Sequence, residues 1–476
     1  MHFEDPPAAA VASPAEPETG AWYQGLTRYH WFVFIVASLG WLFDTMDQQL
    51  FNLARRPAVT QLLHVKPGDP SIAEWSGTAT SIFIVGWAIG GLIFGILGDR
   101  IGRAKTMVLT ILLYSAFTGL SALSTNVQMF SFFRFLTGLG VGGEFAVGVS
   151  LVAEVMPDRA RPFALGLLQA LSAVGNMLAA VIGIVLGMME QSGVIGNSWR
   201  PMFVVGLVPA LLAIPIMRRL KEPEKWRVAA ELRAQQKRDG SGPRFGSIGE
   251  LFSHPRWRRN TIVGMLLAFS GVVGLWGIGV FSADLSDSIF RPHFAGQAKA
   301  LGKTVEETQK YVDGLLTIWR GITLLLFNVG AFFGIYAFSR ITHYTGRKPA
   351  FAVSFVIAMI STAFTFWYLK EFSEIFWMVP LMGFCQLALF GGYAIYFPEL
   401  FPTRLRSTGT SFCYNVGRLV AATGPAALGL LSKNVFGGYP TPLNLRYAGV
   451  AMCSVFLIGL IALPFAPETK GQPLPE

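Results

Sequence analysis

Apolar stretches of about 20 residues recur along the chain, separated by short polar segments that carry most of the charges. An α-helix needs roughly 20 apolar residues to cross the hydrocarbon core of a bilayer. The pattern therefore predicts an all-α integral membrane protein with twelve transmembrane helices. The predicted spans are 31–53, 79–97, 105–123, 128–153, 163–188, 199–217, 261–282, 313–338, 350–369, 375–397, 407–432 and 445–465.

The composition agrees with this fold class. Of the 476 residues, 52% are hydrophobic and 14% are charged, whereas about a quarter are charged in soluble domains. The three cysteines (Cys385, Cys413 and Cys453) fall inside predicted spans, which indicates packing residues and neither disulfides nor a metal site. We find no nucleophile–base pattern around the six histidines. We therefore expect no enzyme activity and no cofactor.

Lysine and arginine predict the orientation, because basic residues accumulate on the cytoplasmic side of a membrane. With the N-terminus inside, the cytoplasmic segments hold 24 of these residues, and the outer loops hold 11 when Arg200 and Arg446 at the outer ends of their spans are included. We expect both termini on the cytoplasmic side of the plasma (inner) membrane, and residues 1–30 as a disordered tail without a signal peptide. The basic segment 218–260 predicts contact with anionic lipid headgroups in place of nucleic acid.

The chain contains an internal repeat. Glu154, Pro157, Arg159 and Arg161 recur as Glu399, Pro402, Arg404 and Arg406, 245 residues later. Gly102 and Arg103 recur as Gly346 and Arg347, 244 residues later. Two patterns at nearly one offset predict two six-helix halves, 31–217 and 261–465, joined by the linker 218–260 and followed by a tail, 466–476. Transporters built from such halves bind substrate between them, near the middle of the membrane.

Several segments resemble a known family. Gly95–Lys105 resembles the loop 2–3 signature of the major facilitator superfamily, and Arg134–Glu144 resembles the fourth-helix motif of its proton-coupled members. Pro398–Gly409 and the terminal Pro467–Gly471 are similar to segments of the sugar porter and metabolite/proton symporter branch. The second copy of the loop signature departs from the pattern, because Ser339 stands near the position where an aspartate is expected. The resemblance extends from about Trp31 to the end of the chain, and it implies transport by alternating access.

Charges within the first half predict a proton switch. Asp44 and Asp47 share one face of the first helix, and Arg134 lies at similar depth in the fourth. A charge inside a membrane costs several kcal/mol, so each such residue is a functional candidate. An acid that is moved away from a guanidinium takes up a proton more easily. The resembled porters place an acid and an arginine at these positions, and we expect Asp44 to titrate, with Asp47 as the alternative. A permanent structural salt bridge is the other interpretation.

The second half predicts an anion site. Arg320 and Arg418 lie inside predicted spans of this half, and no predicted span there holds an acidic residue between its ends. Guanidinium groups bind carboxylates through two parallel hydrogen bonds. The alternatives are that Arg320 extends to the membrane surface and that Arg418 binds backbone carbonyls. Further candidates for lining the site are Asn415, Gln386, Trp276, Trp319, Tyr393 and Tyr396.

Charged residues at the predicted cytoplasmic ends form a third group, which the family resemblance implies is a gate that latches the halves together. The gate candidates are Asp99, Arg100, Arg103, Glu154, Arg161, Glu399 and Arg406. Signals for membrane topology are the alternative role. Glu144, near the inner end of the fourth helix, fits either the gate or the proton switch.

These features together predict a proton-coupled symporter for a small organic anion, either a carboxylate or an aromatic acid. One alternative is a sugar or polyol porter, favoured by Pro467–Gly471 and opposed by Ser270–Trp276, which lacks the paired glutamines of a sugar-binding helix. The other is a non-transporting receptor or sensor on the same scaffold. The expected partners are the substrate, protons and the lipid bilayer, and we expect a monomer.

Overall fold

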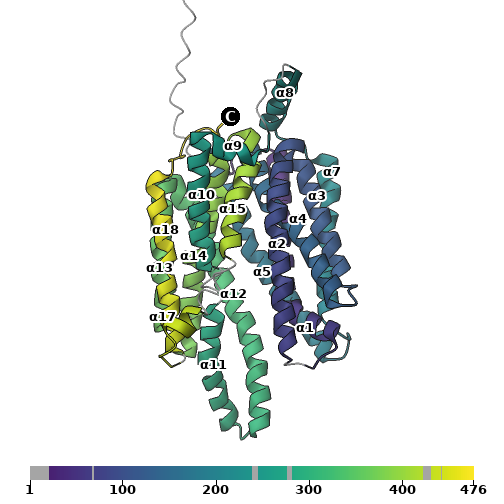
Figure 1. The fold of residues 1–476 in the computed structure, drawn as a ribbon, viewed down its shortest axis with the longest axis vertical. Coiled ribbons are helices and arrows are strands. Elements are labelled where there is room, and N and C mark those ends of the chain that lie inside the picture. Colours follow the sequence, from purple (N-terminus) through teal and green to yellow (C-terminus); the bar gives the residue numbers. More distant parts are fainter. Residues whose placement is uncertain (1–20, 67–68, 239–244, 276–280, 422–429, 441) are drawn as a thin grey trace, which may run out of the picture.

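The computed structural model describes residues 21–66, 69–238, 245–275, 281–421, 430–440 and 442–476. In these ranges the chain is helical and contains no strand (Figure 1). The first part comprises α1 (Arg28–Leu63), α2 (Pro70–Ile101), α3 (Arg103–Ser121), α4 (Val127–Val155), α5 (Arg161–Gln191), α6 (Trp199–Val205), η1 (Val208–Leu212) and α7 (Ala213–Arg219). Two helices, α8 (Glu224–Arg238) and α9 (Ile248–Ser253), follow in the linker. The second part comprises α10 (Pro255–Val272), α11 (Phe281–Ala300), α12 (Val305–Thr345), α13 (Arg347–Tyr368), η3 (Phe372–Glu374), α14 (Ile375–Leu400), η4 (Thr403–Leu405), α15 (Arg406–Ala421), η5 (Leu431–Val435), α17 (Leu443–Met452), α18 (Val455–Ala462) and η6 (Leu463–Phe465).

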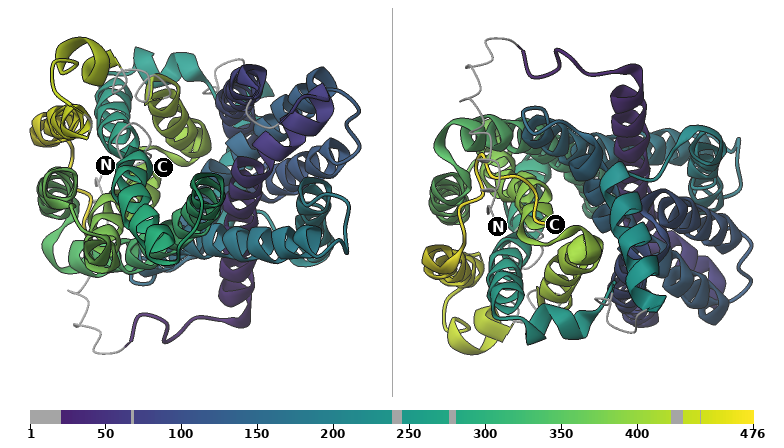
Figure 2. Two further views of the ribbon diagram at one scale, coloured as in Figure 1. Left: turned by 90° about the horizontal axis from the view of Figure 1, so that it is seen from below. Right: turned by 90° about the horizontal axis from the view of Figure 1, so that it is seen from above.

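The helices form two bundles that lie side by side (Figure 2). Among the described residues, nine helical segments are long and apolar enough to cross a membrane. Three further helices, α1, α10 and α15, run beside them and bring the bundle to twelve, as predicted. We call the end of the bundle that carries α8, α9 and the C-terminus the linker end, and the opposite end the far end (Figure 1).

Glycines set the closest helix contacts. A Cβ atom on Gly142 of α4 would lie 2.0 Å from the carbonyl oxygen of Trp87 on α2. In the second half, a Cβ atom on Gly334 of α12 would lie 1.9 Å from the carbonyl oxygen of Phe384 on α14. Lipid supplies no hydrophobic force that drives helices together, so such close backbone contact is what holds membrane helices in place.

The two halves share the same helix breaks. Gly102 separates α2 from α3 with a φ of 113°, and Gly346 separates α12 from α13 with a φ of 97°. The next helix is capped each time by a carboxylate from a distant segment. Glu222 accepts hydrogen bonds from the amides of Ala104 and Lys105 (both 3.2 Å), and Glu468 accepts them from those of Arg347 and Lys348 (2.9 and 3.0 Å). Each glutamate thus satisfies free N–H groups at a positively polarised helix start.

Three regions contain more structure than the sequence predicts. Residues 21–30 were expected in a disordered tail, but α1 begins at Arg28, and the Trp22 ring stacks on Phe163 with centroids 5.9 Å apart. The linker forms two helices, α8 and α9. Between the seventh and eighth predicted spans, α11 and the first turns of α12 project beyond the other helices at the far end (Figure 1).

Candidate functional site

Arg134 of α4 lies beside Asp47 of α1, and both side chains are fully buried. The Nη1 atom of Arg134 is 3.9 Å from Oδ2 of Asp47. The guanidinium also donates to the Ser121 hydroxyl (2.6 Å from Nη2, 3.1 Å from Nε), and its Cζ lies 4.6 Å from the centre of the Phe203 ring. The carboxylate that the structure places against Arg134 is therefore Asp47.

Asp44 occupies a different environment on the same helix. Its side chain is 1% exposed, and Oδ1 has no hydrogen-bond partner among the described residues. The charges that act on Asp44 are those of Glu144, Asp47 and Arg418. Arg418 belongs to the other half of the molecule, so charges from both halves act on Asp44.

Arg418 of α15 reaches across to the first half. Its Cζ lies 3.6 Å above the ring of Trp87 on α2 and 4.6 Å from the ring of Tyr414. Such cation–π contacts stabilise a guanidinium by up to about 2 kcal/mol where water is excluded. The side chain is 9% exposed, and its Nε and Nη1 atoms have no hydrogen-bond partner among the described residues. Two buried donors are thus available at the contact between the halves.

Between Arg418 and the linker end, α15 and α2 pack together. Asn415 donates to the carbonyl and hydroxyl oxygens of Ser411 (both 3.0 Å), and it lies against Gly91 of α2, where a Cβ atom would be 2.2 Å from Nδ2. The rings of Phe145 and Tyr414 stack across the halves with centroids 4.3 Å apart. The halves are therefore in contact along this pair of helices from Arg418 to the linker end.

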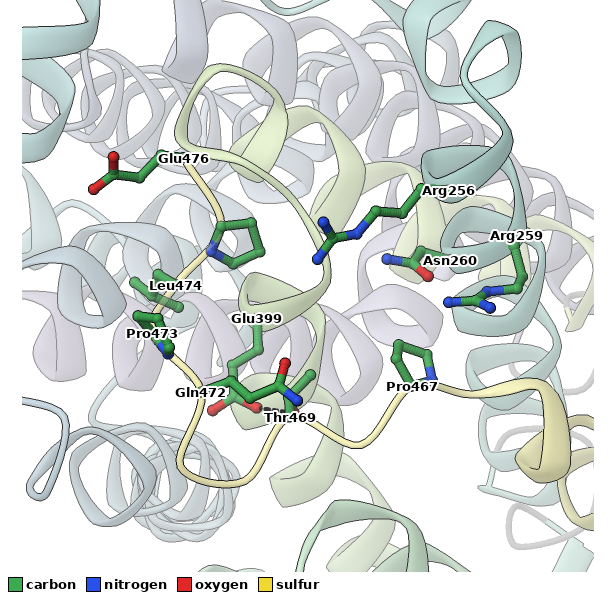
Figure 3. A pocket seen from close by; sticks show the side chains of 11 residues that line it. Arg256, Arg259, Asn260, Glu399, Pro467, Thr469, Gln472, Pro473, Leu474 and Glu476 are labelled. Carbon is green, nitrogen blue, oxygen red and sulfur yellow. Dashed lines mark hydrogen bonds between the residues drawn. The ribbon is translucent and has the colours of Figure 1, made fainter. Parts of the chain in front are cut away.

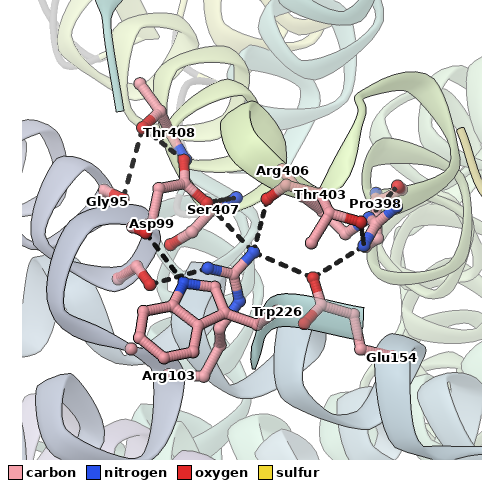
Figure 4. Close-up of polar contacts among 12 residues, drawn as sticks. Gly95, Asp99, Arg103, Glu154, Trp226, Pro398, Thr403, Arg406, Ser407 and Thr408 are labelled. Carbon is pink, nitrogen blue, oxygen red and sulfur yellow. Dashed lines mark hydrogen bonds and ion pairs between the residues drawn. The ribbon is translucent and has the colours of Figure 1, made fainter. Parts of the chain in front are cut away.

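At the linker end, one carboxylate of the first half binds arginines from both halves (Figure 4). Oε1 of Glu154 accepts hydrogen bonds from Arg103 (2.8 Å) and from Arg406 (2.6 Å). Arg103 also crosses to the second half, donating to the carbonyl oxygen of Thr403 at 2.7 Å. All three charged side chains are buried or nearly so. Charge-assisted hydrogen bonds of this kind are about twice as strong as neutral ones.

Asp99 makes the second contact between the halves at this end. Its carboxylate accepts hydrogen bonds from the amides of Ser407 (3.1 Å) and Thr408 (2.9 Å), and from the Thr408 hydroxyl (2.6 Å) (Figure 4). These groups form the first turn of α15, so Asp99 of α2 caps a helix of the other half. Asp99 also pairs with Arg103 at 3.1 Å.

The other gate candidates lie at the same end but make different contacts. Arg100 donates to the linker carbonyls of Phe245 and Gly246 (3.1 and 3.2 Å). Arg161 donates to the carbonyl oxygen of Ala153 (2.8 Å) and pairs with Asp158, both in its own half. Glu399 binds Arg347 through two hydrogen bonds of 2.7 and 3.0 Å within the second half. This last pair repeats the Arg103–Glu154 pair at the offset of the internal repeat.

The remaining substrate candidates of the second half are distributed more widely. Gln386 donates to the Thr362 hydroxyl at 2.7 Å, and the Tyr393 hydroxyl donates to the carbonyl oxygen of Leu267 at 2.6 Å. Both side chains are buried between helices of the second half. Arg320 is exposed on α12. Trp276 lies outside the described residues.

The two other aromatic candidates also have defined neighbours. Trp319 packs edge-on against Phe372, with ring centroids 4.6 Å apart, in an aromatic cluster toward the far end. The Tyr396 hydroxyl donates to the carbonyl oxygen of Pro467 at 2.6 Å, at the linker end. The rings that contact Arg418 in the described part of the chain are those of Trp87 and Tyr414, and not these two.

A cavity of about 580 Å³ opens at the linker end of the second half (Figure 3). It lies between α10, α14 and the C-terminal segment that follows Pro467. Arg256, Arg259 and Asn260 line one side. Of the predicted site residues, Glu399 alone contributes to the lining.

Sequence reasoning did not identify Trp87 as the partner of Arg418, nor did it place Glu144. Glu144 is 1% exposed and its carboxylate acts electrostatically on Asp44, one of the two aspartates of the predicted proton switch. Nothing in the sequence distinguishes Trp87 from the other 11 tryptophans. Glu222 was also missed, although it precedes Glu468 by 246 residues and so extends the repeat.

Comparison with known proteins gives consistent results. The sequence profile of the Major Facilitator Superfamily matches residues 37–286, and the profile described as sugar (and other) transporter matches residues 263–470. The chain is 28% identical over 454 residues to a probable 4-methylmuconolactone transporter of Cupriavidus pinatubonensis, covering 95% of this chain and 94% of that one. It is 27% identical over 440 residues to the cis,cis-muconate transport protein of Acinetobacter baylyi, covering 92% and 95%.

Among solved structures, the fold is similar to that of the proton:xylose symporter XylE, with a TM-score of 0.67 at 17% identity, covering 94% of this chain and 98% of that one. The matched profile spans more than half of the chain, and the helical bundle agrees with it. The chain therefore belongs to the Major Facilitator Superfamily and is a membrane transporter.

Proposed function

We propose that this transporter is a proton-coupled symporter that carries a small organic anion, a carboxylate or an aromatic acid, by alternating access. The observation that carries the proposal is Arg418, whose buried guanidinium presents two donors without partners at the contact between the halves. A buried cation of this kind favours an anionic ligand, and a carboxylate matches the guanidinium geometry.

The position of Asp44 supports coupling to protons. Asp44 is buried in the first half and acts electrostatically on Arg418. While Asp44 is ionised, it competes with a substrate carboxylate for the field of the arginine. A proton on Asp44 removes this competition, so proton binding and anion binding favour each other. The related transporters named for muconate and methylmuconolactone, a dicarboxylate and a lactone acid, agree with this chemistry.

The linker end corresponds to the cytoplasmic side in this proposal, and the protein resides in the plasma membrane with both termini inside. The excess of basic residues in the linker and at this end supports the assignment. All three native cysteines are buried, so the orientation is testable with Ser253→Cys in the linker and Val305→Cys at the far end. An impermeant maleimide added to intact cells should label the second variant and not the first.

Arg418→Gln tests the substrate class. The lost charge-assisted contacts are worth about 1.5–3 kcal/mol, which corresponds to a loss of roughly 10- to 150-fold in affinity for an acid. Arg418→Lys should restore little, because an ammonium group lacks the planar fork. The measurement is binding of benzoate and cis,cis-muconate against their amides. Wild type should prefer the acids, and Arg418→Gln should lose that preference. Arg227→Gln, an exposed residue of α8, is the matched control.

A sugar or polyol porter is the second candidate. The match of residues 263–470 to the sugar (and other) transporter profile favours it. A wild-type protein that binds sugars and binds acids no better than their amides would replace the anion proposal with this one.

A further inference from the structure

Glu144 of α4 is a buried acid to which the proposed function assigns no role. Its side chain is 1% exposed. The Thr110 hydroxyl of α3 donates to Oε2 at 2.6 Å, while Oε1 has no hydrogen-bond partner among the described residues. A carboxyl group at this depth is expensive to ionise without partners. Its retention in the interior therefore points to a function in which it gains and loses a proton.

The space for this carboxyl group is provided by Gly40 of α1. A Cβ atom on Gly40 would lie 2.4 Å from Oε1 of Glu144. Gly40 precedes Asp44 by one helical turn, and residues four apart share one helix face. The rise of the helix puts Gly40 about 6 Å closer to the linker end than Asp44. The three acids thus follow one face of α1 in the order Asp47, Asp44, Glu144 toward the linker end.

Other polar and charged groups facing these acids come from three helices. Tyr114 of α3 is fully buried, its hydroxyl has no hydrogen-bond partner among the described residues, and Glu144, Asp44 and Asp47 all act on it electrostatically. A tyrosine hydroxyl both donates and accepts hydrogen bonds, so it suits a position between two carboxyl groups. Arg134 of α4 lies against Asp47, and Arg418 of α15 acts on Asp44. Glu144 has neither arginine as a described ion-pair partner.

We propose that Glu144 is a second proton-binding site, which takes the proton from Asp44 and releases it toward the linker end. The inference rests on the proposed proton coupling and deepens it. The proton leaves the Asp44 carboxyl group, which becomes a carboxylate beside Arg418, and joins the Glu144 carboxylate. Glu144 then loses it to water when the halves open at the linker end. The restored charge on Asp44 competes with the substrate for Arg418 and favours substrate release on the same side.

The test uses full-length protein in liposomes with cis,cis-muconate and terephthalate as probes, since these dianions do not cross a bilayer unaided as benzoic acid does. With the membrane potential held at zero, a gradient of one pH unit drives about tenfold accumulation of an anion carried with one proton. Wild type should approach this ratio for the acid that it carries. Glu144→Gln should fall to a ratio of about 1, since an amide carries no proton, yet keep counterflow exchange at equal pH. Glu144→Asp retains a carboxyl group and should retain accumulation. Glu231→Gln, exposed on α8, is the matched control and should behave as wild type.

A second variant changes the surroundings of Glu144 and leaves Glu144 itself unchanged. Gly40→Ala places a methyl group against Oε1 of Glu144 and should slow gradient-driven uptake with Glu144 itself intact. Unfolding temperatures in detergent establish that each variant is folded.

The outcomes separate the two proposals. A wild type that accumulates neither acid with a pH gradient contradicts the proposed function and this inference with it. A wild type that accumulates them, together with a Glu144→Gln variant that does so equally, contradicts the inference alone. Loss of counterflow in folded Glu144→Gln, loss of accumulation in Glu144→Asp, or unchanged uptake in Gly40→Ala would also overturn it.

Discussion

Asp44 and Asp47 are separated by about one helical turn, yet the neighbouring helices give them different surroundings. Asp47 lies 3.9 Å from Arg134, whose guanidinium is held in turn by Ser121. Within the described part of the chain no arginine forms an ion pair with Asp44, which acts electrostatically on Arg418 of the other half. Asp47 thus contacts an arginine of its own half, whereas a charge of the second half acts on Asp44. Of the two aspartates predicted to face Arg134, Asp47 makes the ion pair, and Asp44 remains the proposed titrating acid.

Substituting each aspartate by asparagine tests whether the two residues also have different roles. Asp44→Asn should abolish uptake driven by a pH gradient and preserve counterflow, because its amide carries no proton. Asp47→Asn leaves Arg134 buried without its carboxylate, and removing one partner of a buried pair costs about 3–5 kcal/mol. A large drop in unfolding temperature is expected for Asp47→Asn only. Accumulation that survives in Asp44→Asn and disappears in a stable Asp47→Asn would move the titrating role to Asp47.

At the scale of elements, the duplicated halves reproduce the same local devices. The ion pair Arg103–Glu154 has its counterpart in Arg347–Glu399, and the helix cap by Glu222 has its counterpart in Glu468. The halves differ where Asp99 caps α15, because the residue 244 positions later is His343, whose ring packs against Phe163 at the start of α5 with centroids 4.9 Å apart. The departure of the second loop signature from the family pattern thus appears in the structure as one contact between halves that is made by a carboxylate and one that is made by a ring.

The twelve helices and their repeat were predictable from the sequence, because apolar length and charge spacing are local properties. The pairing of Asp47 with Arg134, the stacking of Arg418 on Trp87 and the position of Glu144 were not. Each depends on how one helix is rotated against its neighbour. That rotation is set by close contacts such as Gly142 against Trp87 and Gly40 against Glu144, which connect distant parts of the chain.

The cap at α13 predicts a pH dependence of stability. Burial acts to raise the pKa of Glu468, but four backbone amides (Arg347, Lys348, Lys470 and Thr469) outweigh burial and hold this pKa below its ordinary value. A group with a lowered pKa in the folded state stabilises the fold at neutral pH, and this stabilisation is lost as the pH falls through the folded-state pKa. Glu468→Gln should therefore lose about 1 kcal/mol at neutral pH, the usual value of a helix cap.

Thermal unfolding in detergent across a range of pH measures this effect. The difference between wild type and Glu468→Gln should shrink on acidification, while Glu231→Gln should match wild type throughout. A difference that persists unchanged in acid would mean that Glu468 contributes through packing and not through its charge.

At the scale of the whole molecule, the structure is closed at the linker end. The halves are joined there by Glu154 with Arg103 and Arg406, and by Asp99 with the start of α15. Asn176 of α5 and Asn328 of α12 join them near mid-length, with a hydrogen bond of 3.0 Å. With the linker end assigned to the cytoplasm, this arrangement is the conformation in which the substrate site is shut off from the cell interior. For the linker end to open, the buried contacts of Glu154 and Asp99 with the second half must break together.

Glu154→Gln should shift the molecule toward opening at the linker end. The substitution leaves Arg103 and Arg406 buried beside each other without the carboxylate they share, and the loss of one partner in such a site costs about 3 kcal/mol, or roughly 100-fold in the equilibrium between states. Ser411→Cys reports the change, because Ser411 is fully buried between α15 and α2. Maleimide labelling of this cysteine should accelerate strongly with Glu154→Gln and remain slow with Glu231→Gln. Equal labelling rates in the two backgrounds would show that the buried charges at this end do not hold the halves together, and that the helix contacts of α2 with α15 suffice.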